Sequence, residues 1–270
     1  MSSMDVSLII LCLVLFRFSN VCGYDYCSIE KKVCKNQQHI ACHPQQMLKK
    51  GKETSEELKS KFWILPMTTA IQNVILNMHN AARNDMACGT ASDRDGLRFP
   101  AAAYMRELKW DRELEFTATK MVQSCIVEHD ECRATSKFDN VGQNIAVHYA
   151  FLGENFTSLV QALVREWYDE YQDASVEDVE IVKGTPGISH FLQVVADRVT
   201  HVGCAFARCE QKKMQQAKYI YACNYSFSKV FGHKVYTNSS NPAQKCDFVK
   251  SKKSSRYNCL CAPSDFSWSS

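Results

Sequence analysis

Cysteine is the residue type that most constrains how this chain can fold. The 270-residue sequence has 14 cysteines, and Cys12 and Cys22 fall in an apolar leader, so 14 − 2 = 12 remain beyond it. An even number at this density is typical of a disulfide framework formed in an oxidising compartment. A cysteine-bound zinc site needs pairs of closely spaced cysteines, and Cys259 with Cys261 is the only such pair in the sequence. We therefore expect up to six disulfides and no cysteine-ligated metal.

The leader itself indicates secretion. Residues 7–16 read SLIILCLVLF, an apolar run of signal-peptide length that is short for a bilayer span. Small residues near Gly23 predict cleavage before Tyr24. No later stretch of the sequence approaches the roughly 20 apolar residues of a membrane helix. The prediction is a signal peptide over residues 1–23 and a secreted, extracellular protein without a transmembrane segment.

Charge adds little about partners. Lys plus Arg total 32 and Asp plus Glu total 29, for a formal net charge of +3. The charges are spread along the chain, and the short KSKKSSR run at 250–256 is typical of a solvated loop. Nothing in this distribution indicates nucleic-acid binding. The length suits one large domain with extensions.

Apolar periodicity predicts three amphipathic helices over residues 68–86, 112–123 and 158–171. Thr68 or Thr69 is placed to cap the first helix, and Asp111 is placed to cap the second. The expected inward-facing residues are Ile71, Val74, Ile75 and Met78 in the first helix and Leu114, Ala118 and Met121 in the second.

Two later segments predict a pair of strands. Residues 202–206 and 219–224 are rich in β-branched and aromatic residues and are separated by a Lys/Gln-rich loop. This pattern favours antiparallel strands joined by a long hairpin. Cys204 and Cys223 then fall where facing strands can bridge them.

Several sequence motifs together resemble one known family. They are ILNMHNAARN at 75–84, MRELKWDRELEFTATKMVQSC at 105–125, HDEC at 129–132, VGQNIA at 141–146, HFLQVV at 190–195, VGCAF at 202–206 and YACNYS at 221–226. In order and spacing they are similar to the signatures of the CAP superfamily, especially its insect antigen-5-like (venom allergen) branch. The resemblance implies an α+β fold of the αβα sandwich type, with a small antiparallel sheet between helical layers.

The same resemblance implies how the chain is divided. A cysteine-bearing arm is expected over residues 24–67, the CAP domain over 68–230 and a cysteine-containing tail over 231–270. It also implies the arm bridges Cys27–Cys42 and Cys34–Cys132. A Cys88–Cys125 bridge is our guess to compensate for a missing fourth arm cysteine. Cys246 is expected to pair with Cys259, or else with Cys261, leaving the other for Cys209 or for another chain.

The resemblance also places a polar cleft. In much of the superfamily two histidines and two acidic residues meet there, in some members around a divalent metal, and the matching positions are His129, Gln143, Glu170 and His190. Imidazole and carboxylate groups suit zinc binding or acid–base chemistry. Gln143 cannot ionise, so one carboxylate of the set is replaced by a neutral amide. We expect a weak site for a ligand or a divalent metal such as zinc, or a hydrogen-bonded polar cluster, rather than an enzyme active site.

The remaining motif residues either have an expected structural role or differ from the family pattern. His79, Asn80 and Arg83 resemble the family's HNxxR and are expected to satisfy buried carbonyl or carboxylate groups. Four residues depart from the family pattern. Lys229 replaces the usual Asn, Lys234 the usual Pro, Leu192 the usual Thr and Ala196 the usual Trp. Of three N-x-S/T sequons, Asn155 and Asn238 are expected to be glycosylated, whereas a glycan on Asn224 would clash within its strand.

The leading functional hypothesis is a secreted, non-enzymatic CAP-domain protein that binds a ligand or protein partner, with a reproductive (seminal) secretion favoured. One alternative is a salivary or venom antigen-5-like scavenger of small ligands or lipids. Another is a weak metal-dependent hydrolase using His129, Glu170 and His190. The sequence has neither a G-x-S-x-G elbow nor an H-E-x-x-H motif. Expected partners are extracellular proteins or a small hydrophobic ligand.

Overall fold

The computed structural model describes residues 24–47, 61–150, 155–210 and 216–266. The predicted signal peptide and the Lys/Glu-rich part of the arm at 48–60 lie outside these residues. Among the residues described, no helix combines the length and apolarity that a membrane crossing requires.

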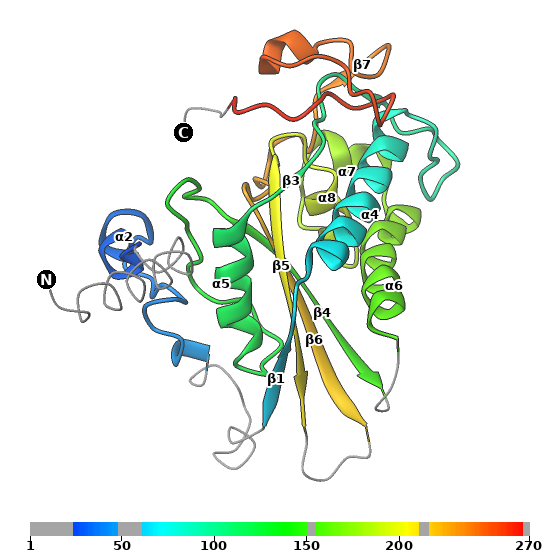
Figure 1. Cartoon of the computed structure of the whole chain (residues 1–270). Coiled ribbons are helices and arrows are strands. Elements are labelled where there is room, and N and C mark those ends of the chain that lie inside the picture. Colours follow the sequence, from blue (N-terminus) through cyan, green and yellow to red (C-terminus); the bar gives the residue numbers. More distant parts are fainter. Residues whose placement is uncertain (1–23, 48–60, 151–154, 211–215, 267–270) are drawn as a thin grey trace, which may run out of the picture.

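A twisted antiparallel sheet forms the middle layer (Figure 1). Its strands run in the order β1 (Phe62–Leu65), β5 (His201–Cys209), β6 (Ala217–Tyr225) and β4 (Gly142–Ala150). A short strand, β3 (Lys109–Trp110), joins β5 in parallel. The β5–β6 pair is the predicted strand pair at 202–206 and 219–224. Strand β1 comes from the range that the sequence assigned to the arm, so that range also contributes to the main sheet.

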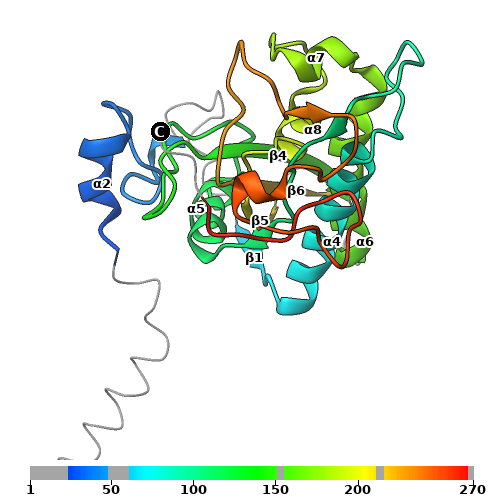
Figure 2. The ribbon, with the colours of Figure 1, turned by 90° about the horizontal axis from the view of Figure 1, so that it is seen from above.

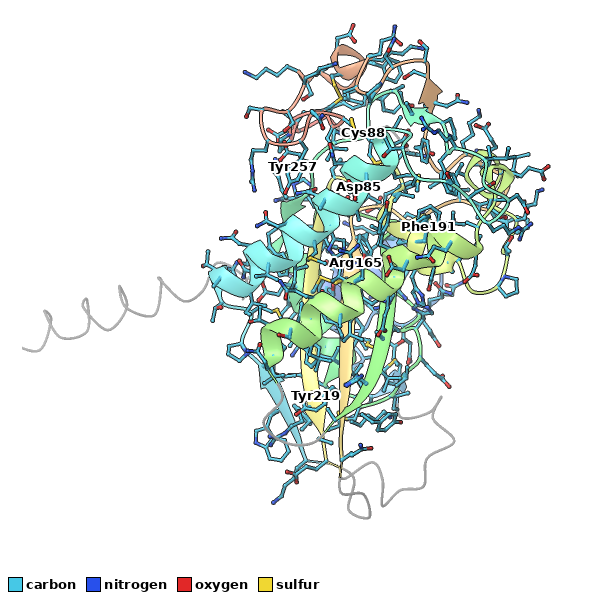
Figure 3. The ribbon with its side chains drawn as sticks, turned by 90° about the vertical axis from the view of Figure 1, so that its right-hand side faces the viewer. Asp85, Cys88, Arg165, Phe191, Tyr219 and Tyr257 are labelled. Atoms are coloured by element: carbon cyan, nitrogen blue, oxygen red, sulfur yellow. A yellow bond between two sulfur atoms is a disulfide. The ribbon has the colours of Figure 1, made fainter. Side chains whose placement is uncertain are left out.

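One face of the sheet carries α4 (Thr69–Ala87), α6 (Phe156–Asp169) and α8 (Ser189–Val194), as Figures 1 and 3 show. Two short helical segments, η2 (Glu170–Asp173) and α7 (Val176–Glu180), lie between α6 and α8 in the chain. The indole of Trp167 stacks on Tyr221 of β6, with ring centroids 5.1 Å apart and an interplanar angle of 11°. Offset aromatic stacking adds to the apolar area buried between helix and sheet.

The opposite face carries α5 (Arg112–Val122). Asp111 caps this helix, and the predicted inward residues Leu114, Ala118 and Met121 are all buried. The helix packs very closely on β5, because a Cβ atom added to Gly203 would lie 2.2 Å from the backbone nitrogen of Glu115. With helices on both faces, the fold is the expected α+β sandwich.

The buried face of α4 differs from the prediction. Thr68 caps the helix as expected. Of the four residues predicted to face inward, only Ile75 is fully buried. The polar residues His79, Asn80 and Arg83 occupy the buried face instead. Ile71 and Met78 are partly buried against the core, so apolar periodicity finds only part of this face. It misses the polar part because His79, Asn80 and Arg83 are buried through hydrogen bonds to backbone groups and to Tyr225.

Helix α6 begins earlier than predicted. Its first residue is Phe156, and the side chain of Asn155 accepts a hydrogen bond from the backbone N–H of Ser158. The predicted start at Ser158 is therefore two residues late.

Six disulfides connect all twelve cysteines beyond the leader. The predicted bridges Cys27–Cys42, Cys34–Cys132 and Cys204–Cys223 are present. The predicted Cys88–Cys125 pair is wrong, and Cys246 pairs with its predicted alternative, Cys261, instead of Cys259. The structure instead forms Cys88–Cys259, Cys125–Cys209 and Cys246–Cys261.

The corrected pairs follow from helix packing. Because α5 lies on β5, Cys125 just beyond the helix comes within a Cα–Cα distance of 5.9 Å of Cys209 at the end of the strand. Cys88 caps the end of α4 and meets Cys259 in the tail. Cys209 is therefore bonded within the domain and not to a tail cysteine or another chain.

The arm and the tail lie at different sides of the sandwich. Helix α2 (Tyr26–Val33) of the arm lies beyond α5, away from α6 (Figure 2). The ring of Tyr26 stacks between His39 and Phe116 of α5. The tail contributes β7 (Asn238–Ser239), paired with β2 (Ala101–Ala102), and the turn η3 (Cys246–Val249) above the sheet.

Candidate functional site: a cleft built on two histidines

The first half of the cleft joins the segment after α5 to strand β4. The Nδ1 atom of His129 lies 2.7 Å from Oε1 of Gln143. An amide oxygen can only accept, so Nδ1 carries the hydrogen and donates it. In the neutral ring the lone pair is then on Nε2.

The amide of Gln143 is held from its other end. Its Nε2 donates to Oδ1 of Asp130 at 2.8 Å and to Oδ1 of Asn224 at 2.9 Å. Asp130 is buried and paired with Arg133, with a carboxylate–guanidinium distance of 2.9 Å. Asn224 donates in turn to Oγ1 of Thr117 on α5. Both hydrogens and the oxygen of the amide are thus engaged, and the position favours a neutral amide over a carboxylate.

The second half joins the end of α6 to the start of α8. Oε1 of Glu170 lies 2.6 Å from Nδ1 of His190. Oε2 accepts from the backbone N–H groups of His190 and Phe191 at 2.9 and 3.0 Å. The carboxylate therefore orients the imidazole and satisfies the first turn of α8. Both of its oxygens are used in these contacts.

Two further contacts fix the ring of His190. The indole of Trp167 stacks on it, with centroids 5.8 Å apart and an interplanar angle of 25°. Asn144 of β4 donates to the backbone oxygen of His190 at 3.1 Å. Trp167 was not recognised as a site residue from the sequence, although it lies in the last turn of α6, three residues before Glu170.

The two halves meet electrostatically. Desolvation lowers the pKa of His129, while its hydrogen bond to Gln143 acts in the opposite direction. Smaller contributions come from Arg133 and His190, which lower the pKa further, and from Asp130, which raises it. The four expected residues form two hydrogen-bonded pairs, His129 with Gln143 and His190 with Glu170.

Lys229 lies in the segment after β6, which is bound to Gln193 of α8. Its backbone N–H donates to Oε1 of Gln193 at 3.2 Å, and Gln193 donates to the backbone oxygen of Phe227 at 2.7 Å. Desolvation lowers the pKa of the Lys229 ammonium, and the carboxylate of Glu170 acts in the opposite direction. The sequence identified Lys229 only as a departure from the family pattern.

The four side chains His129, Gln143, Glu170 and His190 do not have the arrangement of a zinc site. Protein zinc sites use three or four protein ligands, of which imidazole nitrogen is a common one. Nδ1 of His129 and Nδ1 of His190 are engaged in hydrogen bonds, as are the side chains of Gln143 and Glu170. His129, Glu170 and His190 do not bring three ligand atoms within 4.8 Å of one another. These residues therefore do not present the three-ligand set that a zinc site requires.

Another cluster has ligand atoms closer together. Within the described part of the chain, Glu30, Cys42 and His43 are the only three His, Cys, Asp or Glu residues whose ligand atoms lie within 4.8 Å of one another. The sulfur of Cys42 is bonded to Cys27, so it is not a thiolate. This cluster does not make a metal site.

The HNxxR residues have the structural role expected of them. Nδ1 of His79 donates to the backbone oxygen of Ile75, and its Nε2 accepts from the hydroxyl of Tyr225. Asn80 exchanges hydrogen bonds with the backbone of Leu108. Arg83 donates five hydrogen bonds to backbone oxygens of Arg106, Val194, Ala196 and Val199. Arg83 thereby ties α4 to α8 and to the segment before β5.

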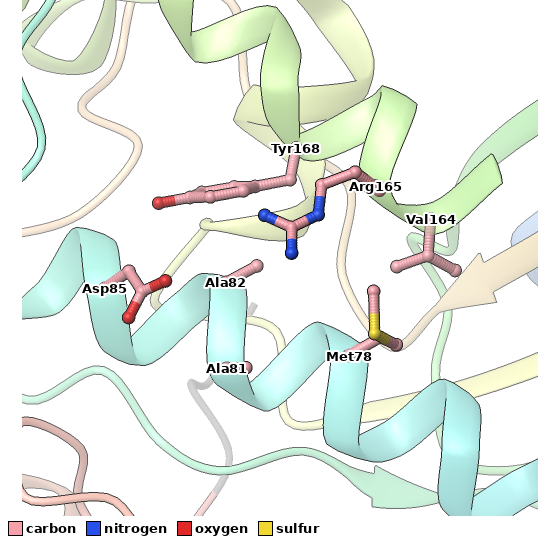
Figure 4. A pocket seen from close by; sticks show the side chains of 7 residues that line it. All are labelled: Met78, Ala81, Ala82, Asp85, Val164, Arg165 and Tyr168. Carbon is pink, nitrogen blue, oxygen red and sulfur yellow. The ribbon is translucent and has the colours of Figure 1, made fainter. Parts of the chain in front are cut away.

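A small pocket lies between α4 and α6, as the close view in Figure 4 shows. Together with the open solvent at its mouth, it encloses about 320 Å³. Its lining mixes apolar side chains with two opposite charges: Met78, Ala81, Ala82, Asp85, Val164, Arg165 and Tyr168. Burial raises the pKa of the Asp85 carboxyl, and the positive charge of Arg165 acts against that shift.

The three sequons differ in accessibility. Asn155 is exposed at the start of α6, and Asn238 is exposed in β7, where its Nδ2 donates to Glu180. Asn224 is fully buried in β6, and its Nδ2 donates to two groups of α5.

A sheet between helical layers and six disulfides define a disulfide-stabilised α/β/α sandwich, which also carries the hydrogen-bonded pairs His129–Gln143 and His190–Glu170. The chain belongs to the CAP family, the cysteine-rich secretory protein family, whose model matches residues 76–225. Venom allergen-1 of Aedes aegypti is 32% identical over 248 residues, covering 90% of this chain and 89% of that protein. The antigen 5-like allergen Cul n 1 of Culicoides nubeculosus is 34% identical over 208 residues, covering 72% and 89%.

Solved structures confirm the fold. A crystal structure of NaASP2 with Zn²⁺ matches with a TM-score of 0.60 and 23% identity, covering 72% of this chain and 96% of that one. BmVAL-1 matches with a TM-score of 0.61 and 18% identity, covering 73% and 96%. At these identities the likeness establishes the architecture alone.

Proposed function

We propose that this protein is secreted and non-enzymatic, and that it binds an extracellular ligand or protein partner through the cleft around His129 and His190. The proposal rests on the hydrogen bonding of Gln143 and Glu170, which occupy the two positions that are acidic in much of the superfamily. Gln143 is a neutral amide, and both oxygens of Glu170 accept hydrogen bonds from His190 and Phe191. Neither is placed as a general base toward a substrate. The carboxylate of Glu170 orients the imidazole of His190, but no described contact pairs either imidazole with a hydroxyl or thiol nucleophile that it could activate.

Secretion is supported by the family and by the cysteines. All twelve cysteines beyond the leader are paired, which requires an oxidising compartment. The test is expression of the full chain in insect cells. We expect the medium to contain a chain that begins near Tyr24, and retention of the intact leader in the cell fraction would contradict the proposal.

The non-enzymatic part is tested with the secreted protein and a double variant, His129→Ala with His190→Ala. We expect neither protein to hydrolyse ester or peptide substrates, with or without added zinc. Turnover that disappears in the double variant would instead establish the weak metal-dependent hydrolase. Circular dichroism would verify that the double variant keeps the fold.

The tissue of secretion is a finer proposal. We keep the reproductive secretion as the first expectation, and a salivary or venom secretion as its alternative, which the venom-allergen names of the relatives support. Peptide mass spectrometry of separate glandular secretions decides between them. Detection in saliva or venom alone would reject the reproductive role.

A further inference from the structure

The tail, residues 231–270, carries an excess of positive charge. It has six Lys or Arg residues and two Asp residues, a net charge of +4, whereas the whole chain has 32 basic and 29 acidic residues, a net charge of +3. The other 230 residues therefore have 26 basic and 27 acidic side chains, a net charge of −1. The positive charge of this protein is thus concentrated in the tail.

Five of the six tail cations are exposed, and none of these five forms an ion pair within the part of the chain that the structure describes. They are Lys245, Lys250, Lys252, Lys253 and Arg256, and together they make up the basic tail patch. The sixth cation, Lys234, pairs with Glu180 at 2.5 Å. Of the two tail acids, Asp265 pairs with Lys109 at 2.9 Å, which leaves Asp247 as the acid beside the patch.

The backbone that carries the patch is fixed at several points. Cys246 is bonded to Cys261, and a second disulfide joins the tail to the end of α4. The backbone N–H of Ser251 donates to the carbonyl of Cys246, and that of Ala262 donates to the carbonyl of Lys252. The tail lies over the upper end of the sandwich in Figure 1 and on the near side in Figure 2. A ligand would therefore order little additional backbone on binding.

Contacts of two patch residues show how far the patch extends. Nζ of Lys250 lies 5.9 Å from the ring centroid of Phe266. Arg256 donates to Oδ1 of Asn77 on α4 at 2.9 Å, and its guanidinium lies over the ring of Tyr257. A ligand that contacts both cations has to extend from Phe266 to α4. This arrangement fits an extended polyanion better than a small anion.

The chemistry of the patch favours a sulfated polysaccharide over a membrane. Short runs rich in Lys and Arg are typical of patches that bind nucleic acid or heparin, and the run at 250–256 has four cations and no acid. The negative surface potential that attracts polybasic segments to membranes belongs to the cytoplasmic leaflet. Phe248 is the exposed aromatic residue beside the patch, and its ring packs on Tyr104 with centroids 5.3 Å apart. One such ring does not make the broad apolar face of a membrane-binding helix.

We propose that the basic tail patch binds a sulfated glycosaminoglycan outside the cell, through ion pairs between its five cations and the sulfate groups. This surface is separate from His129 and His190, and it rests on the proposed function only through secretion. Binding of this kind weakens steeply with salt, because cations released from the polyanion drive it. Such an interaction would hold the secreted protein at cell surfaces or in the extracellular matrix.

Immobilised heparin is the probe, with binding measured by surface plasmon resonance at about 0.15 M salt. The full secreted chain is compared with a tail variant, Lys250→Gln, Lys252→Gln and Lys253→Gln. The matched control is an arm variant that removes the same charge from three exposed lysines, Lys31→Gln, Lys32→Gln and Lys35→Gln. We expect the tail variant to bind at least about tenfold more weakly and the arm variant to bind like the wild type. Equal loss in both variants, or no binding by the wild type, would overturn the proposal.

The salt dependence is a second measurement on the same proteins. The slope of log affinity against log salt should decrease by roughly two to three in the tail variant, since each lost cation releases about one counterion fewer. Changing the same three lysines to arginine keeps the charge and should keep both the affinity and the slope. Weak binding by the arginine variant would contradict a charge-based contact.

Desulfated heparin and lipid vesicles separate the two kinds of anionic surface. Desulfated heparin should compete poorly with heparin for the wild-type protein, and equal competition would overturn the role of sulfate. Vesicles of phosphatidylcholine with phosphatidylserine should bind the protein more weakly than heparin does. Tail-dependent binding to these vesicles without binding to heparin would replace the glycosaminoglycan with a membrane surface.

Failure of this inference is distinct from failure of the proposed function. The double variant His129→Ala with His190→Ala should bind heparin like the wild type. If turnover depends on these histidines, the non-enzymatic function fails while heparin binding stands. If heparin binding does not depend on the tail lysines, the basic tail patch fails while the proposed function is unaffected.

Discussion

The Nε2 atom of Gln143 lies 2.8 Å from Oδ1 of Asp130, so residue 143 is a hydrogen-bond donor toward a buried carboxylate. This contact explains why the amide suits this chain. A carboxylate in its place would face Asp130 and the accepting oxygen of Asn224 with no hydrogen to offer.

Gln143→Glu is therefore expected to destabilise the protein by about 2–4 kcal/mol at pH 7, through lost donors and like-charge repulsion. Repulsion raises the pKa of the introduced carboxyl above its unfolded value, so the loss is present above that value and shrinks as the pH falls and the group becomes protonated. Denaturant unfolding at pH 7 and pH 4.5 would measure the difference. Gln45→Glu on the exposed arm is the matched control, and an equal effect of both substitutions would contradict the argument.

His79 makes stability depend on pH. Burial lowers the pKa of this fully buried ring to about 4, below the ordinary value near 6.5. The unfolded chain therefore binds the extra proton, and the stability from neutral His79 is complete above pH 6.5 and is lost as the pH falls toward 4. The loss should approach about 3 kcal/mol. His79→Gln should reduce the difference in unfolding free energy between pH 7 and pH 4.5, and an unchanged difference would contradict this role.

Arg83 should be among the costliest side chains to truncate. Its five hydrogen bonds saturate four backbone oxygens in the interior. Arg83→Met leaves these oxygens without their donors and should cost about 3–5 kcal/mol or prevent secretion. Arg112→Ala removes an arginine whose side chain is 60% exposed and paired with Glu115, and should cost less than about 1 kcal/mol. Similar melting temperatures for the two variants would contradict this role.

The tail should depend on one bridge for its covalent attachment. Cys246–Cys261 closes a loop inside the tail, whereas Cys88–Cys259 ties the tail to the end of α4. Replacing Cys88 and Cys259 with serine should cost about 2–4 kcal/mol and expose the tail to proteases. Limited proteolysis under non-reducing conditions should then release tail peptides from a resistant core. The Cys246→Ser, Cys261→Ser variant should keep its tail fragments attached through Cys259.

Glycan attachment should follow exposure. We expect Asn155 and Asn238 to carry glycans and Asn224 to carry none, because Asn224 is fully buried and bonded to α5. Glycosidase treatment with peptide mass spectrometry would locate the modified residues. Unmodified Asn155 and Asn238 in insect-cell material would reject the expectation.

Asn155→Gln should also destabilise the protein by about 0.5–2 kcal/mol, since Asn155 caps α6.

Local patterns predicted much of the architecture. The α5 residues Leu114, Ala118 and Met121 and their cap Asp111 could be read directly, because helical spacing alone decides which side chains share a face. The same reasoning failed for α4, where Arg83 is buried by hydrogen bonds to distant carbonyls. Periodicity registers apolar side chains and does not register such partners.

The sequence by itself determined that the cysteines are paired and where β5 and β6 lie. Only the tertiary structure decided that Cys88 meets Cys259, since a bridge needs two Cα atoms within several ångströms and this pair is 171 residues apart. It also decided that Asp130 holds Gln143 and that Glu170 orients His190. The physical reason is that hydrogen bonds and Coulomb interactions depend on distance in space, which packing of helices on the sheet sets for residues far apart in the chain.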